Sequence, residues 1–290
     1  MSAVENRISA IIVTHNSMPL LEDCLEGLKA ALHHLEHEVI VVDNNSSDHS
    51  ATVAARHFPG GRVLTNRDNR GFAAACNQGA GIAGGEFLLF LNPDVRVDLD
   101  GVRNILAVFA RKDRIGLAGA RLRHPSGTFQ ATCRRFPTVE NLLFSRGSFF
   151  ARLPRTARKR DTHRYTMPDF HKTTIVDAVA GTMAMIRRDL FWHVGGFDER
   201  FFMYMEDTDL SLRLVNDGYV NVFVPASGGV HHWRKGSNAG RLRRRWHHHR
   251  SVWKYFRKHE PGTYASLVLP VLLAANFLLT SLLPEPRRGA

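Results

Sequence analysis

Closely spaced cysteines are missing from this sequence. The three cysteines, Cys24, Cys76 and Cys133, are scattered and form no CxxC pair. This spacing argues against a structural zinc site and against a disulfide framework. Residues 1–7 are polar, and the apolar run Ile8–Val13 is too short for the core of a signal peptide. We therefore expect a protein of the reducing cytoplasm.

Two common nucleotide-binding signatures are also absent. No GxGxxG follows the first apolar run, which counts against a dinucleotide site. No GxxxxGK followed by Ser or Thr occurs, so ATP hydrolysis through a P-loop is unsupported. We find no internal repeat.

Acidic residues are outnumbered by basic ones, 27 against 39, which gives a formal net charge of +12. Such an excess implies an anionic partner, which is a nucleic acid, a phospholipid surface or a phosphorylated substrate. The hydrophobic fraction of 44% indicates a packed core rather than disorder. The 290 residues suffice for one large α/β domain, with or without a C-terminal extension.

Strand and helix patterns alternate through the first half of the chain. The expected strands are Ile8–Thr14, Val39–Asp43, Arg62–Thr65 and Glu86–Leu91, and the expected helices are Pro19–Leu35, Ser50–His57 and Gly71–Ala83. This alternation predicts a parallel sheet covered by helices on both faces. Ligands of such sheets bind beyond the carboxyl ends of the strands.

The second half is less regular. Residues 126–172 are basic and loop-like, and we expect part of this stretch to order only with substrate. The pattern beyond it predicts strands at Thr174–Val179, Gly181–Ile186 and Val220–Val224, and a helix from Glu206 to about Asp217.

Polar clusters follow three of the predicted strands: Thr14-His15-Asn16, Asp43-Asn44 and Asn92-Pro93-Asp94. Asp43 can accept hydrogen bonds from a nucleobase or a ribose, and Asp94 can hold a divalent cation against a diphosphate. Each cluster alone is equally compatible with a simple turn. The same holds for Gly71, which either reverses the chain or lets the backbone approach a diphosphate at a helix start.

Three acids, Glu206, Asp207 and Asp209, open the predicted helix beside the aromatic run Phe201–Tyr204. Acids at a helix N-terminus are stabilised by the helix dipole, so a structural role is credible. An apolar wall beside a carboxylate also raises its pKa toward the range of a general base.

His231, His232 and Trp233 follow the last predicted strand. A neutral imidazole is a good ligand for Mn²⁺-like ions, and an indole can pack on a sugar ring. A histidine pair in a loop is otherwise typical of a solvated surface. Together with Asp94, one of these histidines would complete a carboxylate–imidazole metal site.

In this order the segments resemble the family 2 glycosyltransferases of GT-A fold, particularly their bacterial rhamnosyltransferase-like branch. The matching segments, spread over residues 8–237, are Ile11–Asn16, Val41–Asp48, Asn69–Phe72 with Asn77, Leu91–Asp94, Gly181–Met183, Gly195–Glu199 and Phe202–Leu210. Each short motif is common, whereas the ordered set is specific.

The resemblance implies an α/β, GT-A fold with a Rossmann-like, mostly parallel central sheet flanked by helices. Residues 1–238 would form the glycosyltransferase domain, with a nucleotide-binding half (1–125) and an acceptor and catalytic half (126–238). Residues 239–290 would be a basic and hydrophobic extension that associates with a membrane.

The resemblance also implies roles for individual residues. Contacts to the nucleotide sugar are expected from Thr14, His15, Asn16, Asp43, Asn69, Gly71, Phe72, Asn77, Asn92, Asp94 and Gly181. Asp94 matches the metal-binding acid of the family's DxD-type motif, although Asn92 stands where many relatives have Asp. His232 matches a histidine that completes the metal site in some relatives, and the ion would be Mg²⁺ or Mn²⁺.

Asp207 matches the family's catalytic base, with Glu206 beside it, and Tyr204, Asp209 and Trp233 are expected in the acceptor and sugar pocket. One base implies in-line displacement with inversion at the anomeric carbon. The expected donor is dTDP-L-rhamnose, with UDP-hexoses as the alternative, and the expected acceptor is a glycan or a polyprenyl-diphosphate-linked sugar.

The last fifty residues combine a basic run, Arg241–Arg250, with an apolar run, Leu267–Leu283. Basic residues beside an anionic leaflet each contribute about 1 kcal/mol of attraction. The apolar run can span a bilayer, lie in its interface or dock on the domain, and we favour the interface. No nucleic-acid-binding fold accompanies the basic run. We therefore expect attachment to the inner face of the cell membrane and no nucleic-acid partner.

Two rival functions are a sugar-nucleotide pyrophosphorylase and a non-catalytic nucleotide-binding or nucleic-acid-binding protein. The first would need a glycine-rich basic loop after the first strand, where this chain has Thr14-His15-Asn16-Ser17. The acids Asp94, Glu206 and Asp207 argue against the second.

Overall fold

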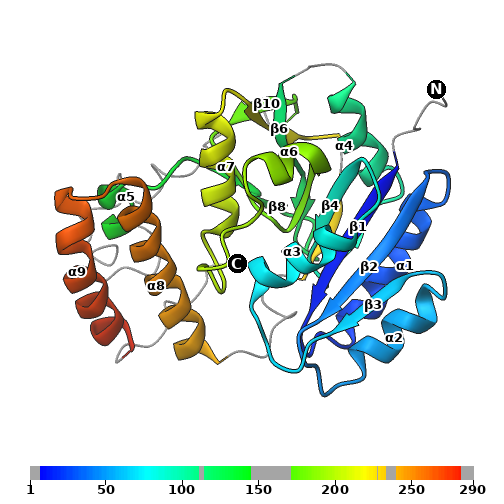
Figure 1. The fold of residues 1–290 in the computed structure, drawn as a ribbon, viewed down its shortest axis with the longest axis horizontal. Coiled ribbons are helices and arrows are strands. Elements are labelled where there is room, and N and C mark those ends of the chain that lie inside the picture. The colour runs from blue at the N-terminus through cyan, green and yellow to red at the C-terminus, as the bar shows by residue number, and fades with distance from the viewer. Residues whose placement is uncertain (1–6, 111–113, 145–170, 227, 233–239, 282–290) are drawn as a thin grey trace.

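A mostly parallel, eight-stranded sheet forms the centre of the protein (Figure 1). The computed structural model describes residues 7–110, 114–144, 171–226, 228–232 and 240–281. The strands of the sheet are β1 (Ile8–Thr14), β2 (His37–Asp43), β3 (Arg62–Thr65), β4 (Phe87–Leu91), β6 (Ile115–Ala120), β10 (Thr174–Val176), β12 (Met183–Arg187) and β13 (Val220–Val224). Their order is β10-β13-β6-β12-β4-β1-β2-β3, in which β10 and β12 run antiparallel to their neighbours.

Both faces of this sheet are buried, as the continuous apolar strands predict. Alternate residues of β1 point to opposite faces, so Ala10 and Ile12 enter one core while Ile11 and Val13 enter the other. Helices α1 (Leu20–Leu32), α2 (Ser50–His57) and α4 (Gly101–Phe109) contribute to the first core. Helices α3 (Phe72–Ile82), α6 (Arg188–His193) and α7 (Glu206–Asn216) contribute to the second. Each fully buried Leu or Ile contributes about 1.5–3 kcal/mol relative to an exposed one.

Two small sheets extend the second half of the chain. One has the order β5-β14-β7-β8 and contains β5 (Val95–Val97), β14 (Gly229–His231), β7 (Leu122–Arg123) and β8 (Phe129–Gln130). The other pairs β9 (Cys133–Arg134) with β11 (Ala178–Val179). The basic stretch therefore contains short strands and helix α5 (Val139–Phe144), and residues 145–170 lie outside the described part.

The single strand predicted at Thr174–Val179 is divided in two. Asp177 separates β10 from β11: its carboxylate Oδ2 accepts a hydrogen bond from the Phe136 amide at 3.1 Å. Its carbonyl accepts another from the Asn221 side chain at 2.8 Å. These contacts turn the chain from the central sheet to the small one, and no local sequence pattern marks such a change of partner.

The C-terminal helices α8 (Arg241–His259) and α9 (Tyr264–Ser281) lie side by side next to α7, away from β1–β3 (Figure 1). A third apolar core joins them to the domain and consists of Phe201, Met205, Val252, Tyr255, Phe256 and Leu269. Within the described part of the chain, no helix combines the length and apolar character needed to cross a membrane. Through the third core, helix α8 packs on the rest of the domain.

Candidate active site

The polar clusters predicted at the strand ends meet at one edge of the central sheet. Strands β2, β1 and β4 are neighbours and run parallel, with Thr14 paired to Asp43 and Ile12 paired to Leu91. The Asn44 amide donates to the Thr14 carbonyl at 2.8 Å, which continues the pairing beyond the strands. The pairings confirm that the clusters share one edge of the sheet. The physical reason is that the carboxyl ends of adjacent parallel strands lie together.

Thr14 and Asp43 present unpaired polar atoms at this edge. Within the described residues, Thr14 Oγ1 and Asp43 Oδ1 are buried and have no hydrogen-bond partner. The second Asp43 oxygen accepts a bond from the Ser46 amide at 3.0 Å, which holds the carboxylate in place. Leaving a buried polar atom unpaired costs about 1–3 kcal/mol, so these two atoms point to a ligand that supplies the missing hydrogen bonds.

His15 and Asn16 shape the adjoining loop. His15 Nδ1 lies 2.8 Å from the Asn44 carbonyl, and Asn16 Oδ1 accepts a bond from the Ser47 amide at 2.7 Å. Asn16 has a left-handed backbone, with φ of 52°, a conformation that Asn tolerates better than most residues. These contacts fix the loop against the residues that follow β2.

The Gly71 loop connects the polar clusters at the strand ends to the segment before α7. Gly71 has φ of +85°, and a Cβ on it would lie 2.4 Å from the Phe202 carbonyl oxygen. The Gly71 carbonyl accepts a bond from the Asn44 side chain at 3.1 Å, and the Phe72 amide donates to Phe202 at 2.9 Å. Only glycine fits this close approach.

Asn69 and Asn77, which were expected to contact the nucleotide sugar, form hydrogen bonds to the protein backbone. Asn69 Oδ1 accepts a hydrogen bond from the Gly71 amide at 3.0 Å. Asn77 binds both the amide and the carbonyl of Phe197, at 3.0 and 2.8 Å. Asn77 therefore anchors the Gly195–Glu199 segment to α3, a role that its position in the motif did not reveal.

Asp94 lies against His231 rather than against His232, the residue expected from the resemblance. His231 Nε2 is 3.1 Å from Asp94 Oδ1, and His231 Nδ1 is 3.0 Å from Gln130 Oε1, with both side chains of the pair buried. His232 contributes its amide, which donates to the Asp94 carbonyl at 2.9 Å. The difference arises because β14 pairs with β5 through His231 and Val95, and the register selects the residue that faces Asp94.

The donor atoms at Asp94 fit a divalent cation only in part. Within the described residues, no group of three His, Cys, Asp or Glu side chains is placed to hold a metal. Asp94 and His231 offer one carboxylate and one imidazole. Mg²⁺ and Mn²⁺ bound to nucleotides commonly use one or two carboxylates and take further ligands from phosphate and water. Asn92 adds a backbone contact, from its amide to the Thr182 carbonyl at 2.9 Å.

Asp207 is held on both of its oxygens. Oδ1 forms an ion pair with Arg134 of β9, and Oδ2 accepts a hydrogen bond from the Gly181 amide at 3.1 Å. The Arg134 Nε also donates to Thr208 Oγ1 at 3.0 Å. Gly181, expected at the nucleotide sugar, and Asp207, expected as the base, are thus in direct contact. Arg134 was missed because one arginine within a basic stretch gives no local signal.

Glu206 lies next to Asp207 in a different environment. Its side chain is buried, and within the described residues its Oε2 has no hydrogen-bond partner. Burial and the neighbouring Asp207 carboxylate raise the pKa of Glu206 to about 8. Two adjacent acids with separate surroundings are the arrangement by which active sites separate acid and base roles.

The backbone before these acids is strained. Tyr204 and Met205 have φ of 70° and 69°, in the left-handed region that bulky residues rarely adopt. Such residues cost about 1–3 kcal/mol each and persist where the surroundings fix them. The Tyr204 ring lies edge-on to His248 of α8, with centroids 5.5 Å apart.

Asp209, expected in the acceptor pocket, faces away into the protein. Its carboxylate is fully buried and contacts Arg213, Lys258 and His259. We therefore assign it a structural role. Trp233, the other residue expected to contact sugar, lies outside the described residues.

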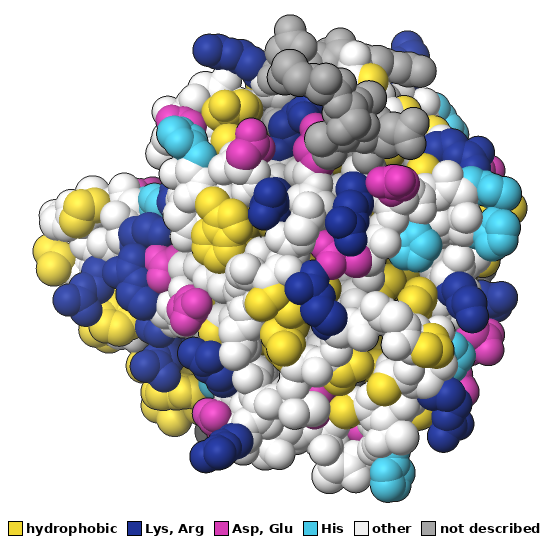
Figure 2. Space-filling model, turned by 45° about the vertical axis from the view of Figure 1, so that its right-hand side comes forward, with side chains coloured by type: hydrophobic (Ala, Val, Ile, Leu, Met, Phe, Trp, Pro, Cys, Tyr) yellow, Lys and Arg dark blue, Asp and Glu magenta, His cyan; other side chains and the backbone are white. Residues whose placement is uncertain are grey.

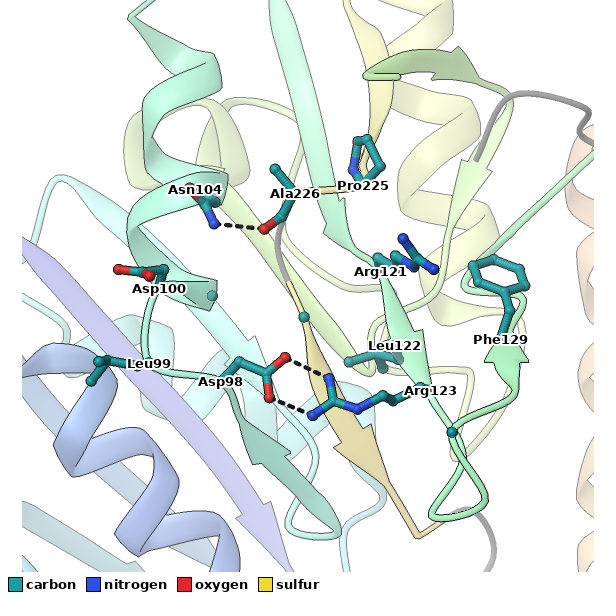
Figure 3. A pocket seen from close by; sticks show the side chains of 13 residues that line it. Asp98, Leu99, Asp100, Asn104, Arg121, Leu122, Arg123, Phe129, Pro225 and Ala226 are labelled. Carbon is teal, nitrogen blue, oxygen red and sulfur yellow. Dashed lines mark hydrogen bonds and ion pairs between the residues drawn. The ribbon is translucent and has the colours of Figure 1, made fainter. Parts of the chain in front are cut away.

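A cavity of about 420 Å³ opens at the other end of β5 and β14 from Asp94 and His231 (Figure 3). Its walls come from the start of α4, from β7 and from Pro225, Ala226 and Gly228, and Arg123 binds Asp98 there through two hydrogen bonds of 2.6 and 2.8 Å. None of the site residues predicted from the sequence lines it.

Comparison with known proteins decides the family. Residues 9–195 match the profile of Glycosyl transferase family 2. This chain belongs to glycosyltransferase family 2. The enzyme is 31% identical over 247 residues to an N-acetylglucosaminyl-diphospho-decaprenol L-rhamnosyltransferase of Mycobacterium tuberculosis, covering 81% of this chain and 78% of the relative. It is 27% identical to the rhamnosyltransferase WbbL of Escherichia coli, covering 77% and 82%.

Solved structures show the same fold. A mannosyltransferase from Pyrobaculum calidifontis in complex with GDP-Man and Mn²⁺ superposes with a TM-score of 0.60 at 18% identity, covering 96% of this chain and 74% of that one. Staphylococcus aureus TarS (residues 1–349) superposes with a TM-score of 0.54 at 12% identity, covering 94% and 80%. These structures confirm the GT-A fold. Glycosyl transfer is confirmed by the family and by the relative that is 31% identical, which decides against a pyrophosphorylase or a non-catalytic binding protein.

Proposed function

We propose that this glycosyltransferase moves L-rhamnose from dTDP-rhamnose, with inversion, to a polyprenyl-diphosphate-linked sugar during cell-surface polysaccharide assembly. The observation that carries the proposal is the convergence of Thr14 and Asp43, Asp94 and His231, and Glu206 and Asp207 around the carboxyl edge of one sheet. The relatives named as rhamnosyltransferases support the choice of sugar. A UDP-hexose is the alternative donor, since the TarS fragment has been solved with UDP.

The donor nucleoside binds at Thr14 and Asp43 in this proposal. The unpaired Asp43 oxygen accepts a hydrogen bond from a base imide or a ribose hydroxyl, and the Thr14 hydroxyl donates or accepts a second. Asp94 and His231 would hold a divalent cation, Mg²⁺ or Mn²⁺. That ion, when bound, offsets negative charge on the departing nucleoside diphosphate.

Asp207 is the general base. Arg134 and the Gly181 amide fix its carboxylate, so one of its oxygens can accept the proton of an acceptor hydroxyl without a change of rotamer. The hydroxyl oxygen then attacks the anomeric carbon on the face opposite the diphosphate, which inverts the configuration. Glu206 keeps its own proton at neutral pH and adds no second negative charge beside the base.

The α8–α9 pair supplies a contact to the inner, anionic face of the cell membrane. Leu267, Val271 and Leu278 lie at helical spacing on α9, where 65–70% of each side chain is exposed. Exposed arginines of α8, including Arg243 and Arg250, lie on the adjoining helix. Figure 2 shows basic and hydrophobic side chains together on the lobe that these helices form. An interfacial helix needs this combination of apolar area and positive charge.

The donor is tested with a panel of nucleotide sugars. A donor that binds the native state raises the unfolding midpoint, by about 2.7 kcal/mol in unfolding free energy at 100 times its Kd. We expect protection by dTDP-rhamnose with Mn²⁺ and labelled rhamnose in a lipid-linked product. Protection and transfer with a UDP-hexose alone would replace the donor, and no transfer from any donor would overturn the function.

The membrane contact is tested by sedimentation with vesicles. We expect binding to vesicles containing anionic lipid, weaker binding to neutral ones, and loss of binding in Val271→Asp. Leu99→Asp is the matched control, since Leu99 is equally exposed, at 66%, outside the two helices. Equal binding by both variants would contradict a contact through α9.

A further inference from the structure

One lysine of α8 contacts an acid before and an acid after the pair Glu206 and Asp207. Lys258 Nζ lies 2.8 Å from Asp198 Oδ2 and 2.6 Å from Asp209 Oδ1. Asp198 stands at the start of the segment, and Asp209 lies two residues beyond Asp207 on α7. The lysine therefore joins the two ends of the segment 198–209, which contains Glu206 and Asp207 and which we call the acid loop.

At the Asp209 end of the acid loop, charged side chains form a buried cluster. The carboxylate is 0% exposed and also accepts hydrogen bonds from Arg213 Nε at 2.9 Å and His259 Nε2 at 2.7 Å. Burial would raise the pKa of Asp209, but the His259 hydrogen bond and the charges of Arg213 and Lys258 lower it. Two of its three partners come from α8, so without α8 a buried carboxylate would keep Arg213 alone.

Further contacts from α8 hold the backbone of the acid loop. Ser251 Oγ donates to the Met203 carbonyl at 2.8 Å, and Lys254 donates to the Arg200 carbonyl. The His247 ring stacks on Phe202, with centroids 4.5 Å apart and planes at 20°. The Phe202 carbonyl accepts a hydrogen bond from the Phe72 amide at the start of α3, so the loop is held by both α3 and α8.

The strained residues of the acid loop explain why it needs this support. Tyr204 and Met205 both have positive φ, and Glu206 follows them directly. Backbone strain of this kind is maintained only when surrounding contacts outweigh it. Helix α8 provides such contacts along the loop, from Asp198 to Asp209.

We propose that Lys258 is a positioning residue, through which α8 sets the orientation of the Glu206–Asp207 pair for transfer. This inference rests on the proposed function, in which Asp207 is the base. It gives α8 a role in the chemistry besides any contact with a membrane. A misplacement of the base by about 1 Å can lower the rate about 100-fold while leaving donor contacts intact.

The test compares Lys258→Ala, Lys258→Arg and Arg187→Ala in the full chain. Arg187→Ala is the matched control, because Arg187 forms an ion pair of 2.6 Å with Glu86 at the far end of β4 and β12. We expect Lys258→Ala to lower kcat at least 10-fold with donor binding and acceptor KM within about 3-fold of wild type. Lys258→Arg restores most of kcat, and Arg187→Ala lowers the unfolding midpoint but leaves kcat unchanged.

Two results would overturn the inference. One is a wild-type kcat in Lys258→Ala. The other is an equal fall of kcat in Lys258→Ala and Arg187→Ala, which would mean general destabilisation. If Lys258→Ala does not fold, Ser251→Ala replaces it, since this change removes one hydrogen bond to Met203 and leaves no buried charge unpaired. We expect the same pattern from it with a smaller fall of kcat, and an unchanged kcat would count against positioning by α8.

A second measurement separates this inference from the proposed function. Amide hydrogen exchange at residues 198–209 reports the local opening of the acid loop without any activity assay. We expect faster exchange there in Lys258→Ala than in wild type and no local change in Arg187→Ala. If wild type transfers no sugar, the proposed function fails on its own. Unchanged exchange in Lys258→Ala would refute the support of the loop by α8.

Discussion

Asp94 and His231 are separated by 137 positions in the sequence, yet Asp94 Oδ1 and His231 Nε2 lie 3.1 Å apart. The antiparallel pairing of β5 with β14 brings them together, and Gln130 of β8 contacts the second nitrogen of the imidazole. An outer contact of this kind orients a histidine that ligates metal.

The first prediction concerns these two residues. His231→Ala should lower cation-dependent transfer about 10–100-fold and raise the Mn²⁺ concentration needed for half-maximal rate. His232→Ala should stay within about 3-fold of wild type, because His232 contacts Asp94 through its backbone amide, which the substitution keeps. Initial rates against Mn²⁺ concentration measure both, and EDTA should abolish activity. Equal losses in the two variants would contradict the assignment to His231.

The second prediction separates the two adjacent acids. Asp207→Asn should lower kcat by about 100-fold or more, since it removes the proton acceptor while leaving the strand-end contacts intact. Donor protection against thermal unfolding should persist in this variant. Near-normal turnover by Asp207→Asn, with loss in Glu206→Gln alone, would transfer the base role to Glu206.

A third prediction follows from the raised pKa of Glu206. The folded state holds this proton up to about pH 8, whereas the unfolded chain releases it near 4.5. Between these values the folded state binds more protons, so this group makes stability fall as pH rises, by up to about 1.4 kcal/mol per pH unit. Glu206→Gln should therefore be more stable than wild type at pH 8, by a margin that shrinks toward pH 5. Urea unfolding at both values measures the margin, and a constant difference would refute the raised pKa.

Arg134 gives a fourth prediction. Its positive charge faces Asp207 and also opposes the rise in the pKa of Glu206. Arg134→Ala should lower kcat about 10-fold or more, because the carboxylate of Asp207 is no longer held in place. It should also move the part of the pH–rate profile that reports Glu206 to higher pH, since Glu206 loses a cation that favours its charged form. Arg134→Lys should recover part of the rate. A profile that keeps its shape in Arg134→Ala would mean that Arg134 does not act on the acids.

Much of the fold follows from local patterns. The predicted bounds Ile8–Thr14, Ser50–His57, Arg62–Thr65 and Val220–Val224 coincide with β1, α2, β3 and β13. Apolar alternation and helical spacing are properties of a few neighbouring residues, so they are visible without the rest of the chain. The shared edge of the strand-end clusters also follows, because alternating strands and helices lead to parallel neighbours.

The partners of individual side chains did not follow from such patterns. Asp209 is an acid beside the expected base, so the sequence placed it in the acceptor pocket. Only the packing of α8 on the domain brings Lys258 and His259 against its carboxylate. The choice between His231 and His232 depends on a strand register, where one residue reverses the face.

The sequence by itself determined the family, the strand and helix alternation and the acids that follow the strands and open α7, because these depend on residue type and spacing along the chain. Tertiary structure decided which side chains meet: Arg134 with Asp207, His231 with Asp94 and Lys258 with Asp209. The reason is physical, since a contact between residues far apart in sequence is selected by packing and register over the whole domain, and no short window of residues contains that information.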